Sequence, residues 1–345
     1  SEHAGGWKTY EIIENSKDIL SKFCGCDNDE FIFTSGATEA NNIAILGVGR
    51  GTFSSKRNRI LVSAIEHKCV LEASNALKRQ EDIKIDLIPV NQNGAVDIAA
   101  MKEMIDDTVR LVSVMAVNNE IGTIQDIKSI ASIAHQSGAL LHCDAAQAPI
   151  AVPLPDIFDA ADFISLSAHK MYGPKGIGAI IIKREHQSKI EPLIYGGAQQ
   201  DGLRPGTLAT PLCIGFAAAA EEICAADFSE RRNSLRELRQ SFVEGLRSSI
   251  DGAKLNGPAL AHRHPGNANI QFPHHDGADL LSRLQPNLAA STGAACSSGT
   301  IEPSHVLRAI GLSKQQASNS IRFSLGLGTS RDDVKAALEL ILAAV

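Results

Sequence analysis

Short apolar runs alternate with segments of helical pattern through the first two-thirds of the chain, and this alternation predicts the architecture. The apolar runs predict seven strands, at 31–33, 59–64, 84–90, 111–117, 139–143, 163–167 and 177–182. Helix-length segments lie between several of these runs, as at 127–136. Strands that alternate with helices form a mostly parallel sheet covered on both faces. The pattern therefore predicts an α/β fold with a mostly parallel seven-stranded sheet and helices on both faces.

The last third of the chain has a different pattern, in which amphipathic helices outweigh strands. Its predicted helices and strands are at 211–226, 229–249, 269–272, 320–325 and 331–344. We therefore expect two domains, a large one at 1–225 and a smaller α+β domain at 226–345.

The composition is that of an ordinary globular protein and narrows the possible partners. Of the 345 residues, 44% are hydrophobic and 21% are charged. The length of the chain suits two domains of about 150 residues each. A net charge of −6 argues against nucleic-acid binding through bulk electrostatics. No run approaches the roughly 18 apolar residues of a membrane helix. We therefore expect neither nucleic acid nor a membrane as a direct partner.

The seven cysteines are expected to be reduced. An odd number in a chain of this length argues against a disulfide framework. Cys24 and Cys26 have no second ligand pair at a zinc-like spacing, so no metal site is expected. Because reduced thiols are typical of the cytoplasm, we expect a cytoplasmic location. Residues 1–7 lack the charged start and apolar run of a signal peptide, and we expect the chain to begin partway into a longer gene product.

Polar residues follow the predicted strands at their carboxyl ends, which is where open parallel sheets bind ligands. These residues are 35–39, 66–68, 118–120, Asp144, Gln147 and 167–170. The small residues at 35–39 lead into a helix, where backbone N–H groups can hold a phosphate. An ordinary helix N-cap is the alternative for that turn taken alone. The arrival of all these residues at one edge of a sheet is harder to explain by packing.

Lys170 and Asp144 suggest pyridoxal chemistry. Lys170 directly follows an apolar strand, where partial desolvation would lower its pKa and favour the neutral amine. A neutral amine can form a Schiff base with an aldehyde cofactor. Pyridoxal chemistry also needs an acidic group to keep the pyridine nitrogen protonated. Asp144, on a neighbouring strand, is the candidate, and a helix N-cap is its alternative interpretation.

With these residues assembled, the sequence resembles the cysteine desulfurase family of fold-type I, aminotransferase class V enzymes over essentially its whole length. The motifs that carry the resemblance are Phe-Thr-Ser-Gly-Ala-Thr-Glu (33–39), Glu-His-Lys (66–68), Val-Asn-Asn-Glu-Ile-Gly (117–122), the 144–147 segment, Ser-Ala-His-Lys (167–170), Arg-Pro-Gly-Thr (204–207), Gly-Ala-Ala-Cys-Ser-Ser (293–298), Glu-Pro-Ser-His-Val-Leu-Arg-Ala-Ile-Gly (302–311) and Ser-Ile-Arg-Phe-Ser-Leu-Gly (320–326). Their order and spacing together are highly specific. The family's usual opening motifs would precede residue 1.

The resemblance implies pyridoxal 5′-phosphate as the cofactor and assigns it a set of contacts. Lys170 would hold the cofactor covalently, Asp144 would pair with the ring nitrogen, and Gln147 would hydrogen-bond the phenolic oxygen. His67 would lie against the ring face and assist acid–base steps. The implied phosphate-binding residues are Ala37, Thr38, Ser167 and His169. Helix-surface polarity is the alternative for Gln147.

The resemblance also implies residues on the substrate and partner sides. Asn119 would contact the cofactor or the substrate. Arg322 would grip the substrate carboxylate, a task that suits its planar fork, and a strand-end ion pair is its alternative. Thr207 resembles the position that reaches the phosphate of a partner subunit, so a homodimer is implied.

Cys296 is the implied nucleophile. Its small or polar neighbours suit a mobile exposed loop, whereas a structural thiol, the alternative, usually occupies an apolar site. A free thiol has a pKa of about 8.5, so a local base such as His67 would help to form the thiolate. The spacing from Cys296 to 308–311 resembles the longer-loop group typified by housekeeping and nitrogenase-associated desulfurases. Such a loop could carry a persulfide outward to an acceptor protein.

The implied activity is removal of sulfur from L-cysteine, giving L-alanine and a persulfide on Cys296 for an acceptor protein. Iron–sulfur cluster assembly, tRNA thiolation, nitrogenase maturation and DNA sulfur modification are all open as destinations. The alternatives are a selenocysteine lyase or other β-lyase, a transaminase, and a non-catalytic scaffold for sulfur acceptors.

Overall fold

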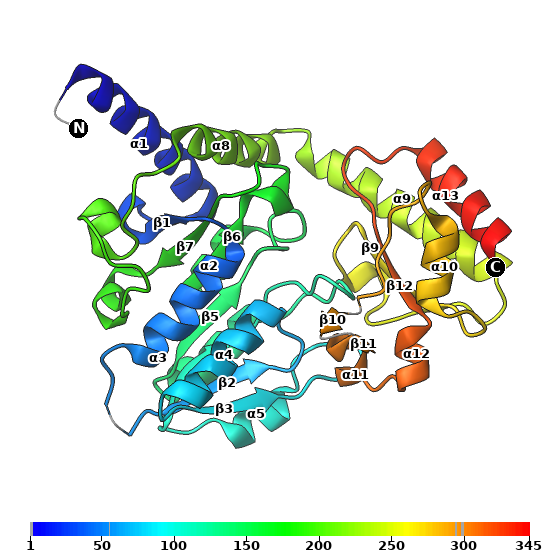
Figure 1. Cartoon of the computed structure of the whole chain (residues 1–345), viewed down its shortest axis with the longest axis horizontal. Coiled ribbons are helices and arrows are strands. Elements are labelled where there is room, and N and C mark those ends of the chain that lie inside the picture. Colours follow the sequence, from blue (N-terminus) through cyan, green and yellow to red (C-terminus); the bar gives the residue numbers. More distant parts are fainter. Residues whose placement is uncertain (1–2, 55, 294, 298–299) are drawn as a thin grey trace. The chain divides into compact units, whose positions relative to one another are not determined.

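The computed structural model describes residues 3–54, 56–293, 295–297 and 300–345, without the side chains of 295–297, 300 and 301. Its contacts divide the chain into two units (Figure 1). Unit 1 comprises Ser1–Ile88, Ile98–Val117 and Gln125–Ala225, whereas unit 2 comprises Pro89–Asp97, Asn118–Ile124 and Ala226–Val345. Two short segments from the first 225 residues therefore belong to unit 2.

A seven-stranded sheet forms the centre of unit 1. In spatial order its strands are β1 (Phe31–Thr34), β7 (Gly178–Ile182), β6 (Phe163–Ser167), β5 (Leu140–Asp144), β4 (Val109–Ser113), β2 (Arg59–Ser63) and β3 (Lys84–Ile88). The strands from β6 to β3 are parallel, whereas β7 is antiparallel to both β6 and β1. The predicted α/β fold with a mostly parallel seven-stranded sheet is confirmed.

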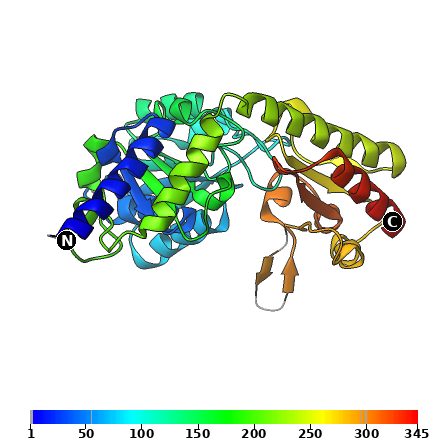
Figure 2. The ribbon, with the colours of Figure 1, turned by 90° about the horizontal axis from the view of Figure 1, so that it is seen from above.

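Helices and short turns connect these strands and bury their apolar side chains. They are α1 (Ala4–Cys24), η1 (Asn28–Glu30), α2 (Ala37–Asn42), η2 (Ile43–Gly47), α3 (Val48–Arg50), α4 (Lys68–Gln80), α5 (Ile98–Met104), α6 (Ile127–Gln136), α7 (Leu154–Phe158), η3 (Ala168–Met171), η4 (Arg184–Lys189), η5 (Gln199–Gly202) and α8 (Thr210–Cys224). Helices α1 and α8 lie side by side (Figures 1 and 2). Strand residues such as Ile60, Leu111 and Ile180 are fully buried in the core between helices and sheet.

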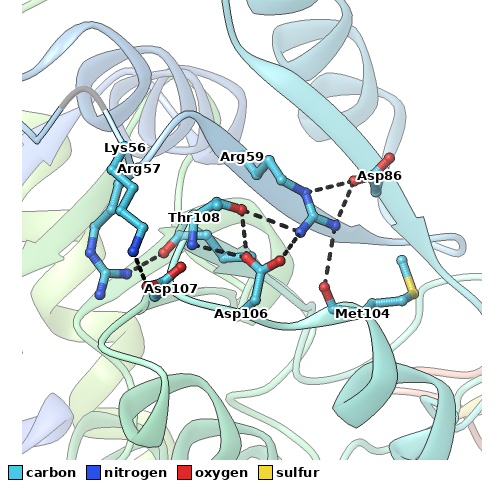
Figure 3. Close-up of polar contacts among 9 residues, drawn as sticks. Lys56, Arg57, Arg59, Asp86, Met104, Asp106, Asp107 and Thr108 are labelled. Atoms are coloured by element: carbon cyan, nitrogen blue, oxygen red, sulfur yellow. Dashed lines mark hydrogen bonds and ion pairs between the residues drawn. The ribbon is translucent and has the colours of Figure 1, made fainter.

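An ion-pair cluster joins the start of β2 and the middle of β3 to the segment before β4 (Figure 3). Arg59, at the start of β2, donates to Asp86 of β3 at 2.9 Å and to Asp106 at 2.9 Å. Arg59 also donates to the Met104 carbonyl at 3.2 Å. The cluster lies at the opposite end of these parallel strands from the carboxyl edge, where ligands bind.

Unit 2 has its own sheet and core. Its main sheet is antiparallel in the order β12 (Ser320–Ser324), β9 (Asn267–Gln271) and β8 (Lys254–Leu255), and β10 (Ala295–Ser297) pairs separately with β11 (Thr300–Glu302). Its helices are α9 (Phe228–Ser249), η6 (Leu260–His262), α10 (Gly277–Leu284), α11 (His305–Ala309), α12 (Lys314–Ser318) and α13 (Arg331–Ala344). Helices α9 and α13 pack side by side (Figure 2). Phe242, Ile270 and Phe323 are buried in this core.

Candidate active site

The turn after β1 has the geometry of a phosphate cradle. Strands β1 and β7 pair Thr34 with Gly178, and a Cβ on Gly178 would lie 2.7 Å from Gly36 Cα. Only glycine fits so close an approach of two backbones. Helix α2 begins directly afterwards at Ala37. Its N-cap residue, Gly36, has no side chain that could accept hydrogen bonds from the first N–H groups of the helix. The turn thus presents a helix start with small residues around it, which suits an anion.

The end of β6 lies next to this turn. Ser167 is the last residue of β6, and a Cβ on Gly36 would lie 4.0 Å from Ser167 Oγ. His169 and Lys170 follow on η3 with exposed side chains. The partly desolvated setting expected for Lys170 is therefore not what unit 1 provides, because η3 carries the lysine beyond the buried end of the strand.

Asp144 is a buried carboxylate at the carboxyl end of β5. Its side chain is 4% exposed, with Oδ2 accepting from Asn41 Nδ2 at 2.7 Å and Oδ1 accepting from the Ala146 N–H at 2.9 Å. Burial raises the pKa of Asp144, and these hydrogen bonds and the charges of His67 and Lys170 oppose the rise. Asp144 closes a turn and does not cap a helix, so the alternative of an N-cap does not apply. A cation placed at this carboxylate would offset the cost of its burial.

His67 stands at the start of α4 and contacts a thiol. Its Nδ1 accepts from the Cys69 backbone N–H at 3.2 Å, and Cys69 Sγ lies 3.0 Å from the same nitrogen. Asn41 Nδ2, which donates to Asp144, also donates to Cys69 Sγ at 3.1 Å. A continuous chain of polar contacts therefore links His67 to Asp144 through Cys69 and Asn41.

A second buried carboxyl group lies near Asp144. Glu66 is fully buried, and its Oε1 accepts from the Met115 N–H at 2.6 Å. Burial, and then the charge of Asp144, raise the pKa of Glu66 well above its usual value. The charge of one of these buried carboxyl groups therefore disfavours ionisation of the other. Gln147, three residues after Asp144, is half-buried.

Unit 2 brings two of the predicted residues together. Arg322 on β12 donates through Nη1 to the Asn119 carbonyl at 3.3 Å. Among the described residues, the Arg322 side chain thus donates to a backbone carbonyl and does not form the strand-end ion pair considered as its alternative role. The backbone of Arg322 also pairs with Ser291, just before the segment that carries Cys296. Cys296 lies in β10, and its side chain is outside the described residues.

The predicted residues thus fall into two groups. Unit 1 contains the turn at 35–38, named the phosphate turn, together with His67, Asp144, Gln147 and 167–170. It also contains Thr207, which is exposed. Unit 2 contains Asn119, Arg322 and the backbone of Cys296.

The unit 1 group fits pyridoxal phosphate. It combines a helix start for a phosphate, a buried carboxylate for a protonated ring nitrogen, and a lysine that can form a Schiff base. Asn41 is fully buried, and its Oδ1 has no hydrogen-bond partner among the described residues. An acceptor left open beside Asp144 is a further sign that this part of the unit accommodates a polar group.

Sequence reasoning missed two residues of this arrangement, Asn41 and Cys69, and it named Glu39 among the polar residues after the first strand without a role for its side chain. Asn41 and Cys69 orient Asp144 and His67, and Glu39 holds the phosphate turn. A signal existed for Asn41, because a polar residue flanked by Ala40, Ile43 and Ala44 at buried helical positions needs a partner. Nothing in the sequence pattern marks Cys69.

Comparison with known proteins identifies the family. The aminotransferase class-V family model matches residues 1–337. Cysteine desulfurase IscS of Rickettsia rickettsii is 40% identical over 343 residues, covering 99% of this chain and 82% of the relative. A NifS-like protein of known structure superposes with a TM-score of 0.91 at 32% identity, covering 99% of this chain and 90% of the other.

A further structural relative has cysteine bound. The structure described as SspA in complex with cysteine superposes with a TM-score of 0.79 at 30% identity, covering 94% of this chain and 89% of the other. No helix within the described residues is long and apolar enough to cross a membrane. From the family match and the extent of these similarities, the chain belongs to the class-V aminotransferase family and, within it, to the pyridoxal-phosphate-dependent cysteine desulfurases.

Proposed function

We propose that unit 1 holds pyridoxal phosphate and that the chain transfers sulfur from L-cysteine to Cys296, releasing L-alanine. The observation that carries the proposal is the buried Asp144 carboxylate, oriented by Asn41 and linked to His67. Such a carboxylate is the partner that a protonated pyridine nitrogen requires. The membership of the family and the cysteine-bound relative support the choice of substrate.

Each residue of unit 1 has a distinct task in this proposal. Ala37, Thr38, Ser167 and His169 bind the phosphate, Asp144 holds the ring nitrogen, and Gln147 binds the phenolic oxygen. His67 packs on the ring and exchanges protons. The bound cofactor supplies an electron sink for negative charge at the substrate Cα. Lys170 would hold the cofactor, and its amine, when free, would accept the proton from the substrate Cα.

Unit 2 supplies the substrate anchor and the nucleophile. Arg322 binds the substrate carboxylate, and Asn119, whose carbonyl it already contacts, lies at the same place. The Cys296 thiolate attacks the substrate sulfur, forming an S–S bond as the substrate Cβ–S bond breaks. The electron pair of the broken bond stays on the carbon side, where protonation gives L-alanine. The sulfur remains as a persulfide on Cys296.

We also propose the wider setting of the reaction. Residues 1–225 form the cofactor domain and 226–345 the domain that carries Cys296 and Arg322. The enzyme acts as a cytoplasmic homodimer, in which Thr207 of each copy reaches the phosphate of the other. The persulfide passes to an acceptor protein, and the net charge of −6 favours a protein over nucleic acid. Iron–sulfur cluster assembly, tRNA thiolation, nitrogenase maturation and DNA sulfur modification are all destinations that this chemistry can serve.

The test measures L-alanine and sulfide from L-cysteine and dithiothreitol. We expect activity in the native protein and loss of both products in Lys170→Ala and Cys296→Ser. Cys224→Ser is the matched control, because Cys224 is an exposed free thiol on α8, and it should retain activity.

The outcomes separate the proposal from its alternatives. L-Alanine production by Cys296→Ser at the native rate would indicate a lyase that needs no covalent sulfur carrier. Consumption of a 2-oxo acid would indicate a transaminase. A native protein that binds the cofactor and releases no sulfur from L-cysteine would contradict the proposal.

A further inference from the structure

We propose that the Glu39–Arg204 ion pair couples the two phosphate sites of a homodimer. One carboxylate fixes the phosphate turn (35–38) of its own subunit. Through Arg204, the same carboxylate fixes the loop that presents Thr207 to the other subunit. The inference rests on the proposed function, specifically on the homodimer and the role of Thr207, and adds Glu39 and Arg204 as positioning residues.

Glu39 binds both segments at once. Its Oε2 accepts from the Ser35 N–H at 2.6 Å, at the first residue of the phosphate turn. Its Oε1 accepts from Arg204 Nε at 2.7 Å, and Arg204 Nη2 donates to Oε2 at 3.3 Å. The arginine thus contacts both carboxylate oxygens, the geometry that gives an ion pair directional strength. The two side chains are 14% and 20% exposed, so solvent screens the pair only partly.

Burial raises the pKa of Glu39, but the hydrogen bonds from Arg204 and Ser35 outweigh it and the pKa is lowered. The carboxylate therefore remains ionised at neutral pH. Guanidinium groups are permanent cations in proteins. Both members of the pair are thus charged under working conditions.

The loop at 199–207, here named the Thr207 loop, is held by hydrogen bonds within itself and to β1, so that the contact of Arg204 with Glu39 can fix the whole loop. Gln199 Oε1 accepts from the Gly206 N–H at 3.1 Å, which closes the loop on itself. Gln200 Nε2 donates to the Arg204 carbonyl at 3.0 Å. The same amide binds Phe33 on β1, accepting from its N–H at 2.7 Å and donating to its carbonyl at 3.0 Å.

The conformation of the Thr207 loop is unusual and therefore needs such anchors. Gln200 and Asp201 have positive φ angles of 51° and 57°, which side chains other than glycine rarely adopt. Gly206, with φ 114°, then turns the chain so that Thr207 is exposed. Loss of the Arg204 anchor should release Thr207 from this position.

The experiment uses mixed dimers, purified with two different affinity tags. One subunit is native and holds the cofactor through Lys170. The other, the donor subunit, carries Lys170→Ala, so that the covalently held cofactor belongs to the native subunit alone. The measured quantity is the rate at which the native subunit releases its cofactor into an excess of cofactor-free scavenger protein. Four donor subunits are compared, carrying Lys170→Ala alone or together with Thr207→Val, Arg204→Gln or Arg184→Gln.

We expect Thr207→Val and Arg204→Gln in the donor subunit to speed cofactor release from the native subunit to a similar extent, about five- to tenfold. Arg184→Gln is the matched control, because Arg184 forms an exposed ion pair with Asp29, and it should leave the rate unchanged. A second measurement tests the other arm of Glu39. Glu39→Gln should weaken the binding of inorganic phosphate to the cofactor-free protein. Thr207→Val should weaken phosphate binding only in the dimer.

The outcomes distinguish two failures. If Thr207→Val speeds release and Arg204→Gln does not, the coupling is wrong and the proposed role of Thr207 stands. If neither variant changes the rate, both the role of Thr207 and the coupling are wrong, whereas the desulfurase activity is tested separately through Cys296.

Discussion

The Cys69 thiol connects residues that the sequence motifs treat as separate. It lies 3.0 Å from His67 Nδ1 and 3.1 Å from Asn41 Nδ2. Burial raises the pKa of Cys69 to about 11, against opposing hydrogen bonds from Asn41 and Thr38. The thiol is therefore protonated at neutral pH and can donate to Nδ1, which already accepts from a backbone N–H. Both contacts favour the His67 tautomer with its proton on Nε2.

Replacement of Cys69 should therefore impair turnover while leaving L-cysteine binding largely intact. We expect Cys69→Ala to lower kcat about three- to tenfold, the effect of one net hydrogen bond, with little change in KM. Cys69→Ser keeps a donor and should recover most of the loss. Nitrogen-15 NMR of the cofactor-free protein should show less of the Nε2-protonated His67 tautomer in Cys69→Ala than in the native protein or Cys69→Ser, because only the backbone N–H then donates to Nδ1. Native turnover in Cys69→Ala would show that the thiol does not position His67.

The site residues that the strand pattern predicts share one property: each lies at the end of a strand or in the segment just after it. His67, Asp144 and Lys170 could be found because strand ends are visible as ends of apolar runs. Asn41 and Glu39 lie inside a helix, and their partners are distant in sequence. The apolar residues around Asn41 indicate that it needs a partner, but no periodicity in a single segment identifies which residue that partner is.

Asp162 joins three elements of unit 1 just before β6. Its buried carboxylate accepts from the Leu141 N–H at 2.7 Å, from His135 Nε2 of α6 at 2.9 Å and from His186 Nε2 of η4 at 3.1 Å. Burial raises the pKa of Asp162, but the bonds from His186, Leu141 and His135 outweigh it and the pKa is lowered. The ionised carboxylate therefore stabilises the junction of these elements.

Asp162→Asn should lower the free energy of unfolding by about 2 kcal/mol at neutral pH, since an amide cannot accept all these bonds. A depressed folded-state pKa contributes stability that is present above the unfolded-state pKa, about 3.9, and is lost as the pH falls through the lower folded value. Urea unfolding at pH 7 and below pH 4 should show the difference between native and variant shrinking with acid. Asp156→Asn, which removes an exposed pair with Lys128, is the control and should change little. A difference independent of pH would contradict this explanation.

Strands were easier to predict than their directions. The apolar runs located all seven strands of the sheet, yet the pattern could not show that β7 runs opposite to its neighbours β1 and β6. A buried strand has the same apolar run in either direction. Helix α1 escaped prediction because much of its surface is exposed and its apolar side chains include Trp7 and Tyr10 on that surface.

Exposed aromatic side chains on unit 1 support the proposed homodimer. Trp7 and Tyr10 of α1 are each 65% exposed, and Tyr195 is 76% exposed. Aromatic residues are enriched at the centres of protein interfaces.

Replacing both α1 aromatics, as Trp7→Ser with Tyr10→Ser, should raise the dimer dissociation constant about tenfold or more. Sedimentation velocity over a concentration series measures the shift. Leu87→Ser is the control, because Leu87 is exposed on the edge strand β3 away from α1, and it should leave the dimer intact. An unchanged dissociation constant in the α1 variant would place the interface elsewhere.

The change of pattern near residue 226 could be predicted, but the contribution of earlier segments to unit 2 could not. Residues 118–124 belong to unit 2 because the Glu120 carbonyl accepts from Asn267 and Asn269 on β9, at 3.1 and 3.2 Å. Such long-range pairing of a polar turn with a strand leaves no trace in local hydropathy. The motif at 117–122 was recognisable, whereas its structural attachment was not.

The Gln200 amide also has a consequence for solubility. Strand β1 is an outer strand of the unit 1 sheet, and outer strands offer unpaired backbone groups to other chains. By binding both the N–H and the carbonyl of Phe33, the Gln200 side chain occupies the place that a strand from a second molecule would take. The Thr207 loop therefore shields the sheet against edge-to-edge aggregation, so this edge is protected only while the loop is folded.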